Sequence, residues 1–288
     1  YNRAVCSTVQ SLGEFMLNCI KESFNLTNKY IILATPLILF SLLSSLYILF
    51  SLGGNLVSLL IALVLFILML AAFISGWSFM LKTCVQEPER DDPNSLIKDF
   101  PAGVGEYFLS VLGLIFIVAV LSIGVLGASY AAGMKLIGNI GISSTAMSGA
   151  LESTVALKSF LMSLTDEQLF RLNAWNLLLL ITMGLEYFLI LFYIPAMFFK
   201  SKNPFKALFL ALKDLFSKKF FENLGLYLIL FISYSILSIL TTIFGLNVIT
   251  HFIFTLINFY YMVFIAVLVF NYYYVNFVKI GGKLDQRI

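Results

Sequence analysis

The hydrophobic residues of this chain fall into long continuous runs. Six runs exceed the about 20 residues that a helix needs to cross a hydrocarbon core of about 30 Å. They cover residues 31–52, 55–81, 104–128, 174–199, 221–245 and 250–277. A transmembrane strand would show about ten residues of alternating polarity, whereas these runs are apolar on every side. The pattern therefore predicts an all-α polytopic membrane protein with six transmembrane helices.

Shorter amphipathic stretches precede the apolar runs. In residues 203–217 the apolar side chains recur at helical spacing, with Lys206 and Lys213 between them. The N-terminal stretch has a similar spacing at Val5, Val9, Leu12, Met16, Cys19 and Ile20. Such a stripe predicts an amphipathic helix that lies in the membrane interface, with its apolar face among the acyl chains. Packing of that face on protein, or on a partner, is the alternative that amphipathicity leaves open.

A short signature at the end of three amphipathic stretches suggests an internal repeat. It consists of an aliphatic residue, a lysine and an acid, at Ile20-Lys21-Glu22, Ile97-Lys98-Asp99 and Leu212-Lys213-Asp214. Two apolar runs follow each copy. The pattern predicts one integral membrane domain, 1–288, with three units of interfacial helix plus helical hairpin at about residues 1–83, 92–200 and 203–288.

The middle unit carries an insertion, about 129–173, between its two apolar runs. Residues 133–149 are rich in Gly, Ser and Ala, which predicts a flexible loop or a bent extension of the third span. Thr165 and Gln168 have the spacing of a capping box, so a helix should begin there. Long insertions in compact proteins are often functional, and this external one is the candidate for an outside contact or gate.

The composition and the charges set the location. The chain is 60% hydrophobic and 11% charged, which excludes an ordinary soluble domain. Lysines and arginines gather in residues 82–98, in 200–219 and after 277, whereas the turns 51–54 and 246–249 carry no charge. Because basic residues mark cytoplasmic loops, we expect a multi-pass protein of the cell membrane with both termini in the cytoplasm.

The basic connection 200–219 offers candidate contacts with lipid headgroups. Lys206, Lys213, Lys218 and Lys219 can meet anionic lipids, and each surface lysine adds about 1 kcal/mol to membrane attachment. The same lysines would also set the topology of the chain, and the two roles are compatible.

Glu186 is the one acidic or basic residue deep in a predicted span, 12 residues from Ala174 and 14 from Lys200. An acid in hydrocarbon costs at least about 2.5 kcal/mol, so it needs a partner. It is either a proton or cation site of a transporter or a structural acid that is hydrogen-bonded to a neighbouring helix.

Three polar residues of the last run extend this candidate intramembrane polar site. Asn258, Tyr260 and Tyr261 lie deep in the span and need hydrogen-bond partners inside the bundle. Two prolines, Pro36 in the first span and Pro195 in the fourth, cannot donate to the helix ladder and are candidate hinges.

No catalytic constellation stands out. The chain has no nucleophile elbow, zinc-protease motif, Walker loop or pair of carboxylates in a span. Cys6, Cys19 and Cys84 fall on the cytoplasmic side, where they stay reduced, and they lack the spacing of a zinc site. No soluble basic domain supports nucleic-acid binding. We therefore expect no enzyme activity, no cofactor and no nucleic-acid partner.

The C-terminal part resembles a known group of membrane proteins. The resemblance covers roughly the last hundred residues and is carried by Tyr193-Ile194-Pro195-Ala196-Met197, Asn203-Pro204-Phe205-Lys206-Ala207-Leu208 and Lys218-Lys219-Phe220-Phe221-Glu222-Asn223-Leu224. The group comprises prokaryotic six-span proteins, including the membrane domain attached to some glycerophosphodiester phosphodiesterases. It implies six helices with interfacial helices in a prokaryotic plasma membrane. It implies no catalytic residue, because the phosphodiesterase site belongs to a separate soluble domain.

Together these features favour a non-enzymatic membrane module that engages lipid or a partner protein, as a scaffold, a subunit of a complex or a homo-oligomer. The alternative is a small-solute or ion transporter or channel with Glu186 at its centre.

Overall fold

The computed structural model describes residues 2–51, 55–143, 148–150, 153–245 and 247–279. No strand occurs among these residues, and six helical segments are long and apolar enough to cross a membrane. The predicted all-α, six-span architecture is thereby confirmed. The elements are α1 (Asn2–Lys29), η1 (Ile31–Leu33), α2 (Ala34–Ser51), α3 (Leu56–Gln86), η2 (Pro93–Lys98), α4 (Asp99–Leu136), α6 (Thr154–Ser163), α7 (Asp166–Ile190), α8 (Tyr193–Phe199), α9 (Pro204–Leu215), α10 (Phe220–Phe244), α11 (Val248–Tyr273) and η3 (Tyr274–Lys279).

The chain divides into two compact units. Unit 1 combines Tyr1–Ile117 with Leu189–Ile288, and unit 2 is Val118–Phe188. The division falls inside α4 and near the end of α7, so both helices contribute to both units. Each unit is described by itself below.

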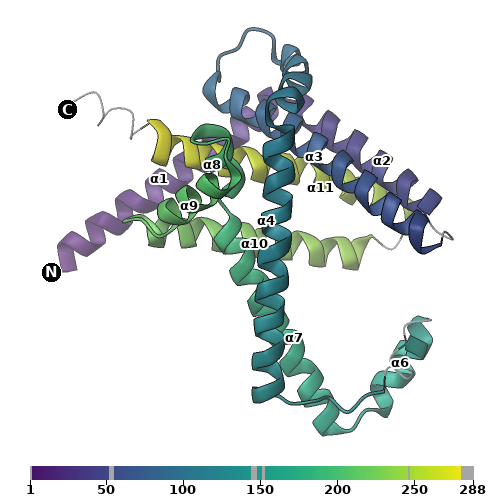
Figure 1. Ribbon diagram of the computed structural model, residues 1–288. Helices are drawn as coiled ribbons and strands as arrows, with labels where there is room; N and C mark the ends of the chain where they lie inside the picture. The colour runs from purple at the N-terminus through teal and green to yellow at the C-terminus, as the bar shows by residue number, and fades with distance from the viewer. Residues whose placement is uncertain (1, 52–54, 144–147, 151–152, 246, 280–288) are drawn as a thin grey trace. The chain divides into compact units, whose positions relative to one another are not determined.

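Two antiparallel hairpins, α2/α3 and α10/α11, form the frame of unit 1, and both project towards the right-hand side of Figure 1. The second helix of each hairpin begins with an asparagine cap. Asn55 Oδ1 accepts from the Ser58 amide at 3.0 Å, and Asn247 Oδ1 accepts from the Thr250 amide at 2.8 Å. These caps satisfy amides at the helix start without a charge.

Small residues bring α3 close to the start of α4. A Cβ added at Gly103 would lie 2.4 Å from Phe79 Cβ, and one at Gly76 would lie 2.6 Å from the Phe100 ring. Such close approach of helices is typical of membrane bundles. The outward faces of the hairpins are apolar and exposed at Leu42, Leu60, Ile232 and Ile253, as expected for surfaces that face lipid.

The helix α1 packs along α11 within unit 1. Its buried face includes Met16, Cys19, Ser23 and Leu26, and Asn271 Nδ2 of α11 donates to Ser23 Oγ at 3.2 Å. For this part of α1, packing on protein is therefore what the structure shows. The side chains of the predicted stripe positions Val5, Val9 and Leu12 and of Cys6, and the whole glycine turn 52–54, lie outside what the structure describes.

The predicted fourth span, 174–199, consists of two helices. α7 ends at Ile190, and α8 begins at Tyr193 with Pro195 in its first turn. Pro195 has no N–H for the carbonyl of Leu191, which favours a break at this point. Pro36 lies in the first turn of α2, which starts at Ala34 after a short 3-10 turn, and both prolines are buried. A hinge motion at either one stays a prediction.

The stretch that ends at Ile97-Lys98-Asp99 was expected to form a third interfacial helix before the third span. The structure has only the six-residue 3-10 helix η2 at this place. Asp92 caps it by accepting from the Asn94 amide, and Pro93 occupies its first position. Since α4 starts directly at Asp99, no room is left for a separate amphipathic helix.

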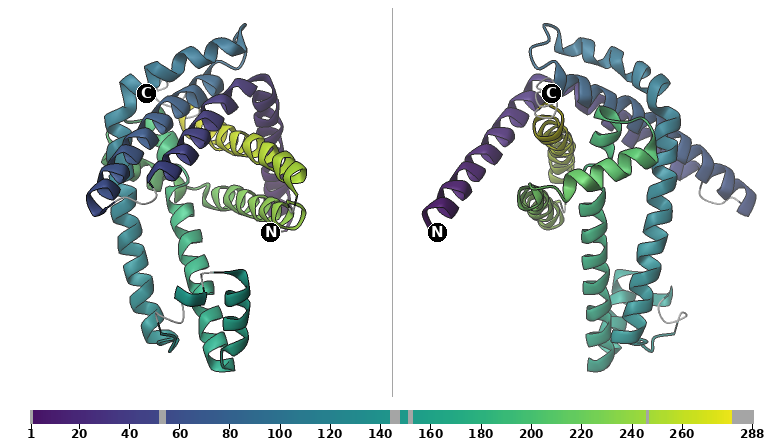
Figure 2. Two further views of the ribbon diagram at one scale, coloured as in Figure 1. Left: turned by 90° about the vertical axis from the view of Figure 1, so that its right-hand side faces the viewer. Right: turned by 60° about the vertical axis from the view of Figure 1, so that its left-hand side comes forward.

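Unit 2 is built on the second half of α4 and on α7, which run antiparallel, as all views in Figures 1 and 2 show. The helix α4 continues to Leu136, beyond the expected end at residue 128, so the insertion begins as an extension of this helix. The expected capping box precedes α7: the Gln168 amide donates to Thr165 Oγ1 at 3.3 Å, and the Thr165 amide donates to Gln168 Oε1 at 3.1 Å.

Candidate functional site

The helix α9 presents its aromatic side chains outward. Phe205, Phe209 and Phe216, directly after the helix, are 66%, 79% and 56% exposed. The buried face opposite comprises Ala207, Ala211, Asp214 and Leu215. In water this arrangement would be unfavourable, because burying a phenylalanine contributes about 1.5–3 kcal/mol. The outward aromatic stripe therefore indicates a surface suited to an apolar medium.

Three lysines accompany the stripe. Lys206, Lys213 and Lys218 are exposed, and none of them makes an ion pair among the residues that the structure describes. Lys206 and Lys213 lie three and four residues from Phe209, so they share its side of the helix. We call Phe205, Phe209 and Phe216 together with Lys206, Lys213 and Lys218 the α9 platform.

Other basic residues near α9 have partners inside the protein. Lys202 Nζ lies 2.8 Å from Glu106 Oε1, and Lys200 Nζ lies 2.7 Å from Asp214 Oδ2. Lys219, one of the four candidate headgroup contacts, is half-buried and donates to Asn276 Oδ1. These three lysines are therefore not included in the platform.

Asp214 anchors α9 from beneath. Its Oδ2 accepts from Lys200 Nζ at 2.7 Å and from the Tyr273 hydroxyl at 2.5 Å, and the residue is only 9% exposed. The Lys200 ammonium also lies 5.3 Å from the centre of the Tyr273 ring. A buried carboxylate with two such donors fixes the helix on α8 and α11, because a buried charge requires both a countercharge and hydrogen bonds.

Asn223 of α10 completes the anchor. Its Nδ2 donates to the carbonyls of Asp214 at 3.1 Å and of Leu215 at 2.9 Å. Carbonyls at a helix end have no partner within the helix, so this amide stabilises the end of α9. The Tyr272 hydroxyl donates to Asn223 Oδ1 at 2.9 Å. Four elements, α8, α9, α10 and α11, thus share one buried polar network.

The acid of the second signature has a related role. Arg90 Nη1 donates to Asp99 Oδ2 at 2.7 Å, and this hydrogen bond raises the pKa of the Arg90 guanidinium. The acid of the first signature, Glu22, accepts from Asn271 Nδ2 at 3.3 Å. The repeated acid was visible in the sequence, but its partners were not, because they lie in other elements.

Glu186 lies in unit 2, on the face of α7 that meets α4. Ser122 Oγ donates to Glu186 Oε1, and seven residues further along α4 Ser129 Oγ lies 2.9 Å from Thr182 Oγ1. Glu186 forms no ion pair with a lysine, arginine or histidine among the described residues. It is half-buried and holds two helices together through a hydroxyl.

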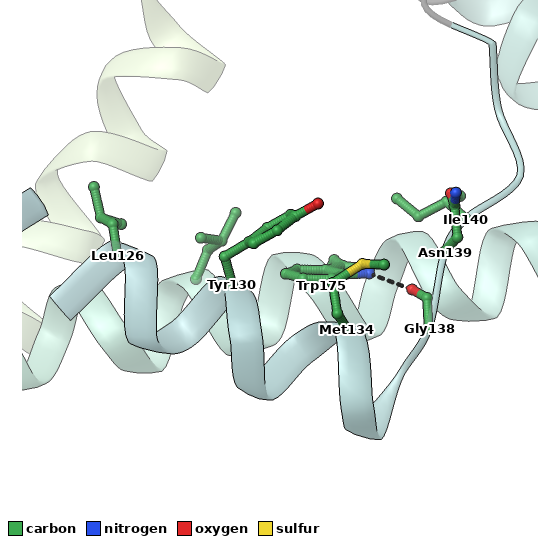
Figure 3. Close-up of a pocket in the computed structure, with 8 residues that line it drawn as sticks. Leu126, Tyr130, Met134, Gly138, Asn139, Ile140 and Trp175 are labelled. Carbon is green, nitrogen blue, oxygen red and sulfur yellow. Dashed lines mark hydrogen bonds between the residues drawn. The ribbon is translucent and has the colours of Figure 1, made fainter. Parts of the chain in front are cut away.

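A pocket of about 460 Å³ lies at the far end of the same hairpin (Figure 3). The Tyr130 and Trp175 rings form one wall, with centres 5.8 Å apart. Trp175 Nε1 donates to the Gly138 carbonyl at 3.0 Å, and Arg171 Nη1 donates to the Asn139 carbonyl at 2.5 Å. α7 therefore fixes the segment after α4 in place. Gly138 has φ +81°, a conformation that favours glycine.

The three other candidates of the intramembrane polar site belong to unit 1, and each forms a hydrogen bond with a different residue. The Tyr260 hydroxyl donates to Asn28 Oδ1 at 2.7 Å, and the Tyr261 hydroxyl is paired with Ser233 Oγ. Asn258 Nδ2 donates to Thr241 Oγ1 at 3.2 Å. Each contact connects α11 to another helix, so these residues account for helix packing rather than for one shared site.

Among the described residues no group of three or more His, Cys, Asp or Glu side chains is placed to hold a metal ion. In unit 1 the candidate site is the α9 platform with the buried network beneath it. In unit 2 there are two separate candidates, the Ser122–Glu186 hydrogen bond and the pocket beside Trp175. Comparison of the chain with models of protein families, with curated proteins and with solved structures finds no match in any of the three.

Proposed function

We propose that this integral membrane protein is a non-enzymatic module that engages anionic lipid through the α9 platform. The observation that carries the proposal is the orientation of α9, with three phenylalanines outward and an acid buried beneath. An interfacial helix needs an apolar face for the acyl chains and cations for the headgroups, and the platform supplies both.

The charges favour a lipid surface over a protein partner. Lys206, Lys213 and Lys218 have no acidic partner within the part of the chain that the structure describes. Each lysine near an anionic leaflet is worth about 1 kcal/mol at moderate salt. A docked protein would need a matching acidic surface with an apolar centre, which is a more specific requirement. The proposal places the platform, both termini and the lysine-bearing connections on the cytoplasmic side of a prokaryotic plasma membrane.

Lipid enrichment around the reconstituted full chain tests this function. The protein is placed in membranes that mix phosphatidylcholine with phosphatidylglycerol, and discs of bilayer are then cut out around it. These discs should contain a larger fraction of phosphatidylglycerol than the membrane as a whole. Replacing Lys206, Lys213 and Lys218 by glutamine should abolish most of the enrichment, and 0.5 M salt should weaken it by screening. Replacing Lys135 and Lys158, two exposed lysines of unit 2, is the matched control. Equal enrichment with and without the platform lysines would contradict the proposal.

Transport is the second candidate, favoured by an acid that lies within a candidate span and has a hydroxyl as its partner. Glu186→Gln separates the two functions. The amide carbonyl can still accept from Ser122, so we expect a change in unfolding free energy below about 1 kcal/mol. Unchanged ion and proton fluxes in proteoliposomes would support the lipid module. Loss of a measurable flux with intact assembly would support transport.

A further inference from the structure

An apolar groove of about 420 Å³ lies between α2, α3 and the start of α4 in unit 1. Leu39, Phe40 and Leu43 contribute from α2, and Ala72 and Phe73 contribute from α3. All the lining side chains of this groove are apolar, and none carries an N–H or O–H donor. Its volume lies within the about 300–1,000 Å³ that is usual for small-ligand pockets.

Aromatic packing holds the groove open. The Phe40 and Phe73 rings are stacked with centres 4.3 Å apart, and the Phe73 and Trp77 rings are stacked at 5.4 Å. Trp77 Nε1 donates to the Leu33 carbonyl at 2.9 Å, which ties this row of rings to the start of α2. Phe100, on the other wall, fits against Gly76, where a Cβ would lie 2.6 Å from its ring. The groove is therefore pre-formed.

The chemistry of the walls identifies the occupant. A cavity lined by apolar side chains without a donor offers little to orient a polar ligand, so its occupant is a hydrocarbon. α2 and α3 are both candidate membrane spans, which puts the groove among acyl chains. From Pro36 to Leu43 the α2 wall covers eight residues, about 10 Å from the first to the last at the helical rise, enough to accept a segment of an extended chain.

A cation follows a groove residue directly in the chain, at the end of η2 and just before α4. Ile97 lines the groove, and the next residue, Lys98, is exposed. Lys98 makes no ion pair among the described residues, whereas the nearby Arg90 is neutralised by Asp99 at 2.7 Å. An uncompensated lysine beside a hydrocarbon slot is complementary to a lipid with an anionic headgroup.

We infer that this groove holds one acyl chain of an anionic phospholipid whose headgroup lies at Lys98. The inference extends the proposed lipid engagement to a second place and does not require the α9 platform. It assigns specific, resident binding of one lipid, in addition to general contact with the leaflet.

Photo-crosslinking of the reconstituted full chain tests the inference. The probe is a trace of phosphatidylglycerol with a diazirine in its acyl chain, and adducts are located by peptide mass spectrometry. Adducts on the groove residues of α2 and α3 should exceed those on outward residues such as Leu42 by about fivefold or more, which corresponds to about 1 kcal/mol of preference. Even labelling of groove and outward positions would overturn the inference.

Two variants sharpen the test. Ala72→Trp fills the groove and should lower groove adducts about fivefold relative to outward adducts in the same sample. Ile61→Trp, an outward position of the same helix that is 57% exposed, should leave the ratio unchanged. Unchanged groove adducts in Ala72→Trp, or a bound protein segment or other molecule in place of lipid, would overturn the inference.

Lys98→Glu keeps the groove intact and covers the case in which Ala72→Trp does not fold. It should reverse the preference for the phosphatidylglycerol probe over the matching phosphatidylcholine probe, and an unchanged preference would overturn the headgroup assignment. Removal of the three α9 platform lysines should not alter groove adducts. The variants of Lys206, Lys213 and Lys218 thus test the platform proposal, whereas the variants of Ala72 and Lys98 test this inference.

Discussion

The two units hold their polar side chains in different ways. In unit 1 the Asp214 carboxylate accepts from Lys200 and Tyr273, and Asn223 continues the network to α10. Between α4 and α7 of unit 2 the polar side chains meet in separate single bonds, Ser122 with Glu186 and Ser129 with Thr182, and the ion pair of Arg171 with Glu167 lies within α7. Unit 1 therefore depends on a countercharge. Unit 2 depends on how closely two helices approach.

The difference follows from what each unit must position. α9 is amphipathic, so a bilayer favours the rotation that turns its aromatic face towards the acyl chains. The buried ion pair beneath the helix fixes the same rotation from the protein side. The helices α4 and α7 expose mostly apolar side chains, so their association rests on close packing, as at Gly133 against the Trp175 ring. Electrostatic and steric substitutions should accordingly affect different units.

The largest effect is expected from Asp214→Ala in unit 1. The substitution leaves the Lys200 ammonium without its countercharge, and breaking a buried pair costs about 3–5 kcal/mol. The Lys200 side chain keeps 23% exposure, which places the expected loss near the lower limit. Reversible unfolding of the protein in mixed micelles measures this free energy. Asp91→Ala, at an exposed loop acid, is the control and should change it by less than about 0.5 kcal/mol.

A double variant distinguishes a charge effect from a packing effect at the same place. Lys200→Met combined with Asp214→Leu removes both charges and keeps apolar volume, so most of the lost stability should return. A double variant as unstable as Asp214→Ala would mean that the ion pair is not what orients α9. The contrast between the two units would then fail.

In unit 2 a steric change should have the larger effect. A Cβ at Gly133 would lie 2.3 Å from the Trp175 ring, so Gly133→Leu must separate α4 from α7 and should cost about 1–3 kcal/mol. Trp175 emission during unfolding, in a Trp77→Phe background, reports the hairpin directly. The control is Gly127→Leu, because a Cβ there meets nothing within 4 Å. The control should be neutral or more stable, by up to about 0.8 kcal/mol.

Most of the fold could be predicted because long apolar runs leave a chain little choice in a bilayer. The ends of the helices were harder to predict from the sequence. α4 continues to Leu136 because Tyr130, Ala131 and Ala132 still favour a helix after the apolar run has ended. The break between α7 and α8 was signalled by Pro195, since proline disrupts the ladder one turn before itself.

The candidate site could be predicted from the sequence only in part. Lys206 and Lys213 could be placed on α9 from spacing alone, and Glu186 could be found as a lone acid in a span. The anchor could not be predicted, because Asp214 and Tyr273 are 59 residues apart and nothing in either local pattern links them. The same reason applies to Lys219, which looks like a surface lysine until Asn276 is placed beside it.

The smallest effect concerns α1, and it tests whether this helix belongs to the rigid frame of unit 1. Cys19 is 3% exposed against α11, and burial raises the pKa of its thiol from about 9 to about 11. Because the thiolate is the nucleophile, about 100-fold less of it is present at neutral pH. In a Cys6→Ser, Cys84→Ser background, Cys19 should therefore react with a maleimide at least that much more slowly than a cysteine at the 56% exposed position Leu17.

The sign of the pH dependence gives a second readout of the same contact. Between about pH 9 and pH 11 the unfolded chain releases the Cys19 proton while the folded chain retains it, so the raised pKa makes stability fall as the pH rises through this range. Cys19→Ser should reduce that slope by the contribution of this one thiol. Rapid labelling of Cys19 at pH 7, at the rate of the unfolded protein, would mean that α1 leaves α11 in the bilayer. The ordered frame of unit 1 would then begin at α2, and α1 would be left as a helix of the interface.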